Sequence, residues 1–152
     1  MSKAFTKDDR PDEPVVVRHR PPLPDGVPNY VTARGLQALR DQLGAIEPTA
    51  PTAAARRSEL EQRIATAVVA EPPAARDEIR FGARATLRAQ DGQTRQVQIV
   101  GVDEADPAAG LIAFVAPLAR ALLGRRVGDL ATVRTPGGEE ELEILAIDYA
   151  GC

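Results

Sequence analysis

Residues 83–102 read ARATLRAQDGQTRQVQIVGV and decide the class of the C-terminal fold. In the first half, alanine and leucine alternate with arginine, threonine and glutamine, which is the pattern of a half-buried strand. Asp91-Gly92 follows, and glycine supplies the positive φ that a tight hairpin turn requires. The apolar run that begins at Val97 predicts a second strand. The stretch therefore predicts a β-hairpin that opens a β-rich region.

Downstream of this hairpin, three more strands and one short helix are expected. The helix is predicted over residues 117–123, because Pro117 suits a first helical turn and Gly124 suits a helix end. The acidic loop of Asp103, Glu104 and Asp106 lacks the regular oxygen spacing of a calcium site, so we expect it to be solvated. The strands are predicted over residues 111–115, 130–135 and 141–149.

Upstream of the hairpin, the sequence predicts two helices. Thr32 is placed to cap the first helix, and the prolines of residues 48–51 end it. The second helix is expected over residues 52–70. Two helices joined by a short proline-bearing turn indicate an antiparallel hairpin, a short coiled coil. The apolar seam of the first helix, at spacings of three and four, consists of Leu36, Leu39, Leu43 and Ile46.

The chain divides into three regions by composition. Residues 1–30 hold six of the 13 prolines and many charges, so we expect a disordered or extended tail. Residues 31–78 are assigned to the helical hairpin. Residues 79–152 are assigned to an antiparallel β-sheet domain with one short helix. The predicted class is therefore α+β.

Scarce residue types exclude several kinds of chemistry. The chain has one histidine, His19, one cysteine, Cys152, and no tryptophan. A Ser-His-Asp or Cys-His site would need His19, which lies in a proline-rich stretch, and a zinc site lacks ligands. The net charge of −3 and a hairpin balanced in charge argue against direct DNA binding. We therefore expect no self-contained enzyme chemistry, no metal or cofactor, no membrane segment and a cytoplasmic location.

Five short motifs in the order found here carry a family resemblance. The most specific is APLARALLG over residues 116–124, followed by Val127-Gly128-Asp129. The sequence resembles the GreA/GreB family of bacterial transcription elongation factors, more the GreB branch, over most of residues 27–150. The other motifs are Asn29-Tyr30-Val31-Thr32 with Gly35-Leu36, Phe81-Gly82-Ala83, Ile99-Val100-Gly101 with Asp103-Glu104, and Thr135-Pro136-Gly137-Gly138.

The resemblance implies an FKBP-like C-terminal domain that docks at the rim of the secondary channel of bacterial RNA polymerase. In that family the helical hairpin enters the channel, and acidic residues at its tip help to hold a second Mg²⁺ in the polymerase active site. The resemblance assigns polymerase binding to Ala116, Pro117, Leu118 and Leu122. Ala116 stands where the family has serine, so we expect the helix at 117 to lack a side-chain cap.

The hairpin tip departs from the family's acidic motif. Glu47 is the one acid in the turn, and Arg56 and Arg57 are the nearest charged residues beyond it. A lone carboxylate is a poor Mg²⁺ site, and the short hairpin resembles in length that of Rnk, a relative of the family. We therefore predict a monomeric, non-catalytic polymerase regulator without stimulation of transcript cleavage.

Several alternatives stay open from the sequence. The chain would still promote cleavage if Glu47 sufficed. A peptidyl-prolyl isomerase is less favoured, because its pocket would have to use Phe81, Phe114 and Tyr149. The arginines at 56 and 57 either face a partner or lie on a solvated helix start, where pairs such as Glu59–Arg63 form at i, i+4.

Overall fold

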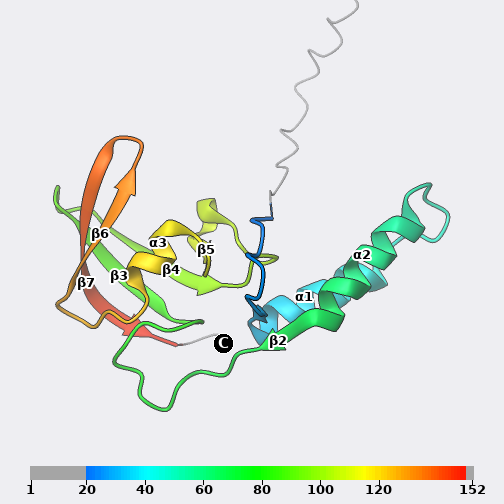
Figure 1. Cartoon of the computed structure of the whole chain (residues 1–152), viewed down its shortest axis with the longest axis horizontal. Coiled ribbons are helices and arrows are strands. Elements are labelled where there is room, and N and C mark those ends of the chain that lie inside the picture. The colour runs from blue at the N-terminus through cyan, green and yellow to red at the C-terminus, as the bar shows by residue number, and fades with distance from the viewer. Residues whose placement is uncertain (1–19, 150–152) are drawn as a thin grey trace, which may run out of the picture.

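The computed structural model describes residues 20–149 and consists of a curled β-sheet with a pair of helices projecting from one side (Figure 1). Residues 1–19 of the tail predicted over residues 1–30, including His19, lie outside the described residues, as does Cys152. The arrangement is mixed α+β, as the sequence predicts.

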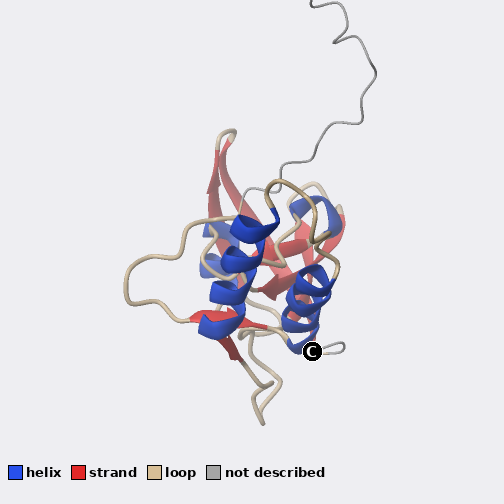
Figure 2. Cartoon of the chain, turned by 90° about the vertical axis from the view of Figure 1, so that its right-hand side faces the viewer, coloured by secondary structure: helices blue, strands red, loops and turns tan. Residues whose placement is uncertain are grey.

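The helical pair consists of α1 (Ala33–Gly44) and α2 (Ala53–Thr66). The Thr32 hydroxyl accepts a hydrogen bond from Gly35 N at 2.9 Å, which confirms the predicted cap. The two helices lie side by side (Figure 2), and Leu39 of α1 and Leu60 of α2 are fully buried. With 12 and 14 residues, the helices are about 18 and 21 Å long.

The second helix is shorter than predicted, and its expected last turn is a strand. β2 (Ala67–Val69) pairs in parallel with β1 (Asn29–Val31), so the prediction of a helix through residue 70 was wrong. Asn29 Nδ2 donates to the carbonyl of Arg63 at 3.3 Å and to Thr66 Oγ1 at 3.2 Å, which satisfies the helix end. Val68 and Val69 follow after Ala67, and β-branched side chains favour the strand once a partner is available.

The main sheet has five strands in the order β5-β4-β3-β7-β6. Neighbouring strands are antiparallel except for β4 and β5, which are parallel, so the prediction of an antiparallel sheet was wrong at this edge. The chain can return in parallel because residues 101–110, with the short 3₁₀ helix η2 (Pro107–Ala109), form a crossover. The strands are β3 (Arg84–Ala89), β4 (Thr94–Val100), β5 (Leu111–Ala113), β6 (Leu130–Thr135) and β7 (Gly138–Asp148).

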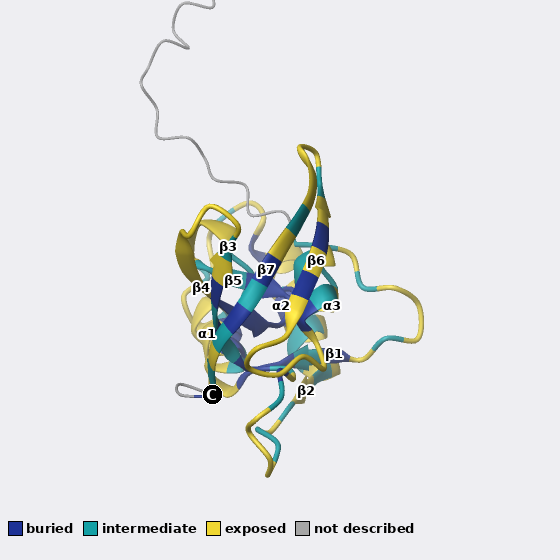
Figure 3. Cartoon of the chain, turned by 90° about the vertical axis from the view of Figure 1, so that its left-hand side faces the viewer, coloured by how far each residue is buried: buried dark blue, intermediate teal, exposed yellow. Residues whose placement is uncertain are grey.

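The core lies between the sheet and α3 (Pro117–Leu122). Buried and exposed residues alternate along β6, as Figure 3 shows, because successive side chains of a strand point to opposite faces. Leu122 of α3 is fully buried in this cluster. Other fully buried members are Ile79, Leu87, Ala131 and Ile144.

Within residues 20–149, no helix combines the length and the apolar character needed to cross a membrane.

Candidate functional site

The proposed docking residues begin at the amino end of α3. Ala116 precedes the helix and gives it no side-chain hydrogen bond, as the sequence predicts, and Pro117 is exposed at the first helical position. Leu118 is half-buried against the core. Leu122 has no exposed surface, so its side chain cannot contact a partner directly. It packs in the hydrophobic core and holds α3 against the sheet. The surface available for docking is therefore Pro117 with the outer part of Leu118.

An apolar groove of about 390 Å³ lies beside the end of α3. Tyr30, Phe81 and Phe114 form a mutually packed aromatic cluster along it, with ring centroids 5.5 to 5.9 Å apart. Leu123, which is 36% exposed, lies on its rim. Tyr149 is absent from this lining, because it is buried and its hydroxyl donates to the carbonyl of Glu78 at 2.5 Å.

The tip of the helical pair lies at the end of the molecule farthest from the sheet (Figure 1). Glu47 is exposed there and accepts a hydrogen bond from Thr49 Oγ1 at 3.3 Å. Arg56 donates to Gln42 Oε1 at 3.1 Å and lies 3.8 Å from a Glu59 oxygen, so it links the two helices. Arg57 is exposed on α2. Glu47 is the one acid of the turn over residues 46–57.

Groups of three or more histidine, cysteine, aspartate or glutamate side chains that could hold a metal ion are absent from the described part of the chain.

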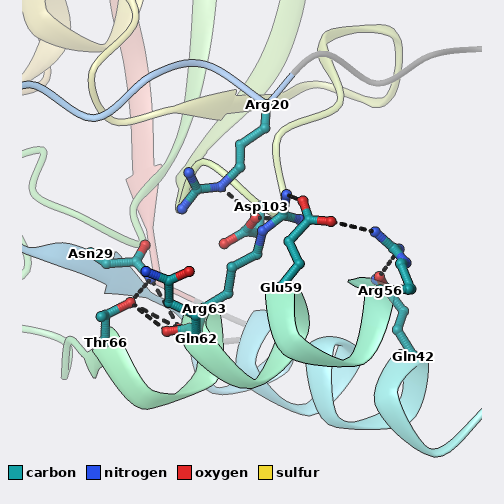
Figure 4. Close-up of polar contacts among 9 residues, drawn as sticks. All are labelled: Arg20, Asn29, Gln42, Arg56, Glu59, Gln62, Arg63, Thr66 and Asp103. Atoms are coloured by element: carbon teal, nitrogen blue, oxygen red, sulfur yellow. Dashed lines mark hydrogen bonds and ion pairs between the residues drawn. The ribbon is translucent and has the colours of Figure 1, made fainter. Parts of the chain in front are cut away.

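The loop after β4 differs from its prediction as a solvated acidic loop. The Asp103 side chain is 5% exposed, and its Oδ1 accepts from Arg20 Nε at 2.7 Å. The same oxygen lies 3.2 Å from Nη1 of Arg63, a residue of α2 (Figure 4). Arg63 also makes the predicted pair with Glu59. The prediction was wrong for Asp103 because this carboxylate meets arginines from two distant segments.

The next acid of the same loop reaches the first helix. A Glu104 oxygen accepts from the Thr32 hydroxyl at 2.5 Å, while that hydroxyl accepts from Gly35 N. Thr32 thus joins the start of α1 to the turn after β4, and it is 2% exposed. The prediction of Thr32 as a helix cap is confirmed, but no sequence pattern predicted its hydrogen bond to Glu104.

Replacing Thr32 by valine is expected to lower the free energy of unfolding by about 1 to 2 kcal/mol. Valine keeps the shape but removes both hydrogen bonds of the hydroxyl. Urea unfolding followed by circular dichroism measures the change. The matched control is Thr52→Val, because Thr52 stands at the start of α2 without a side-chain cap bond. Equal losses in the two variants would contradict the assignment.

Comparison with known proteins identifies the sheet domain. The sequence pattern described as "Transcription elongation factor, GreA/GreB, C-term" matches residues 73–149, which are 77 of the 152 residues. Transcription elongation factor GreB of Neisseria meningitidis serogroup B is 44% identical over 92 residues, covering 59% of this chain and 56% of that protein. GreA of Alkalilimnicola ehrlichii is 44% identical over 98 residues, covering 62% of each. The chain thus spans less than two thirds of these relatives.

Solved structures give a looser likeness. GreA factor homolog 1 (Gfh1) of Thermus thermophilus is 24% identical, covers 80% of this chain and 99% of its own, and superposes with a TM-score of 0.44. At so low a score the overlap carries no argument. The match over residues 73–149 and the identities to the elongation factors show that the chain belongs to the GreA/GreB family of transcription elongation factors.

Proposed function

We propose that this chain regulates transcription elongation by binding RNA polymerase, without stimulating transcript cleavage. The observation that carries the proposal is the family match over residues 73–149 together with a tip that holds a single carboxylate, Glu47. The chain would act as a cytoplasmic monomer and would bind neither DNA of specific sequence nor a membrane. The effect on elongation would come from occupying polymerase rather than from chemistry of its own.

Docking is assigned to the C-terminal domain, in an FKBP-like form, at the rim of the secondary channel. Pro117 is exposed at the start of α3, and Leu118 beside it is half-buried. The apolar groove that Leu123 lines lies beside the other end of α3. An exposed apolar patch on a small domain supports a protein contact. Leu122 contributes by holding α3 in place.

The absence of cleavage stimulation follows from the tip. Mg²⁺ prefers several oxygen ligands in octahedral geometry, and one flexible carboxylate supplies too few. The neighbouring acid Glu59 is already paired with Arg56 and Arg63. The helices are also only about 18 and 21 Å long, which limits how far the tip can reach from the docking domain.

A backtracked elongation complex tests both parts of the proposal in one preparation. We expect the chain to bind the complex while the RNA keeps its length. Pro117→Asp should weaken binding about tenfold or more, because it charges the proposed contact while an acid at a first helical position is tolerated. The control is Gln93→Asp, an equally exposed position in the turn between β3 and β4.

Two outcomes would reject this function. Failure of the wild-type chain to bind polymerase would refute docking. RNA that shortens with the wild-type chain but not with Glu47→Ala would show that the single tip acid suffices, which is the cleavage-stimulating alternative.

A peptidyl-prolyl isomerase is the second candidate, favoured by the aromatic groove. Its lining differs from the sequence expectation, because Tyr30 replaces Tyr149 beside Phe81 and Phe114. The groove is open and close to the docking surface, so we assign it to protein contact. A proline-isomerisation assay on the same protein distinguishes the two functions, since the uncatalysed reaction takes tens to hundreds of seconds.

A further inference from the structure

The turn over residues 101–104 is where the helical pair meets the sheet domain. Its backbone lies directly against β1, so a Cβ atom on Gly101 would be 2.4 Å from the carbonyl oxygen of Tyr30. Glu104 N donates to the carbonyl of Gly101 at 3.1 Å and closes the turn. From this one turn, two consecutive acids reach the helices: Glu104 bonds Thr32 before α1, and Asp103 pairs with Arg63 on α2.

Apolar and polar contacts both hold this junction, since Val31 of β1 and Val102 of the turn are each only 2% exposed. The hydrophobic core of the sheet contains residues from Ile79 onward and none from α1 or α2. Leu39 of α1 and Leu60 of α2 are fully buried and do not belong to that core. Tyr30 of β1 does contact the aromatic rings of the sheet domain, but it lies at the base of the pair. The core of the sheet thus does not include either helix, and the polar contacts of the turn join α2 and the start of α1 directly to the sheet domain.

Asp103 is the most constrained of these polar groups. Arg20, which precedes β1, and Arg63 share its Oδ1, so three segments far apart in the sequence meet at one atom (Figure 4). Its Oδ2 is buried and has no hydrogen-bond partner among the described residues. A buried carboxylate needs its cationic partners, because leaving the charge unpaired in the interior is costly. A swing of α2 that removes Arg63 would leave the buried Asp103 carboxylate with one of its two cationic partners, Arg20.

We propose that Asp103 is a positioning residue that fixes the direction of the helical pair relative to the C-terminal domain, with Arg63 and Arg20 as its two partners. Arg63 ties α2 to the turn. Arg20 joins the segment before β1 to the same carboxylate. We call the two ion pairs of Asp103, with Arg63 and with Arg20, the clamp. If the proposed function holds, this clamp aims the tip of the helices while the C-terminal domain is docked, and that consequence rests on the proposed function.

Distances between two spin labels test the clamp in the free protein. In a Cys152→Ser background, labels on Ser58→Cys of α2 and Thr132→Cys of β6 report the direction of the pair, since both positions are exposed. We expect one narrow distance distribution. Asp103→Asn should broaden it, with the ratio of displaced to clamped molecules rising about 10- to 100-fold, the factor typical for loss of a hydrogen bond to a charged group.

Two further variants separate the clamp from general loss of structure. Arg63→Gln removes the same ion pair from the helix side, should broaden the distribution likewise, and leaves the sheet domain untouched should Asp103→Asn fail to fold. Glu59→Gln is the matched control, because it removes the exposed pair of Arg63 and leaves Asp103 in place. Its distribution should stay narrow.

An unchanged distribution in Asp103→Asn or in Arg63→Gln would overturn the proposal, as would equal broadening in Glu59→Gln. The measurement contains no polymerase. A chain that fails to bind polymerase can therefore still show the clamp, and a failed clamp leaves the polymerase-binding result unaffected.

Discussion

Shortening Leu122 to alanine is expected to lower the free energy of unfolding by about 2 to 5 kcal/mol. Leu122 is fully buried between α3 and the sheet, so the substitution leaves a cavity that the rigid strands cannot close. Chemical denaturation of the full chain measures the loss. Polymerase binding by this variant should be compared at equal concentrations of folded protein, since its side chain lies beneath the proposed contact.

The neighbouring leucine provides the control. Leu123 is 36% exposed on the rim of the apolar groove, so Leu123→Ala should cost less than about 1 kcal/mol of stability. We expect it instead to weaken polymerase binding. A larger stability loss for Leu123→Ala than for Leu122→Ala would contradict the placement of α3.

Replacing Gly101 by alanine is the second large effect. A Cβ atom there would lie 2.4 Å from the carbonyl oxygen of Tyr30 and 3.3 Å from Cα of Val31, and both atoms belong to the backbone of β1. β1 would have to move away from the turn, so we expect a loss of about 1 to 3 kcal/mol or more in unfolding free energy. The displaced β1 should also weaken the contacts of Asp103 and Glu104.

Gly44→Ala is the matched control for this substitution. Gly44 is the last residue of α1 and has open space around it, so alanine should leave stability unchanged or raise it by up to about 1 kcal/mol. Thermal unfolding of both variants gives the comparison. Equal stability of Gly101→Ala and the wild-type chain would show that β1 is free to move at the junction.

Local pattern predicted most elements of the sheet domain. The alternation over residues 83–89 and the Asp91-Gly92 turn formed β3 and its connection to β4, with Gly92 at a φ of 87°. Pro117 begins α3 and Gly124 follows it, as expected for these residue types. These elements were predictable because each depends on the conformational preferences of a few neighbouring residues.

The candidate site was only partly visible in the sequence. Glu47 at the tip and Pro117 at the docking surface are exposed as expected, because turns and helix starts lie at the surface. The burial of Asp103, by contrast, could not be predicted from its sequence neighbourhood. An acid in a loop is ordinarily solvated, and its burial here depends on Arg20 and Arg63, which are 83 and 40 residues away in sequence.

By itself, the sequence determined the α+β class, the two helices, the sheet strands and the family. Only the tertiary structure decided that residues 67–69 form a strand, that β5 runs parallel to β4, and that Asp103 joins the helices to the sheet. The physical reason is common to all three. A strand needs a partner and a buried charge needs a counter-ion, and here both are supplied by segments distant in the chain.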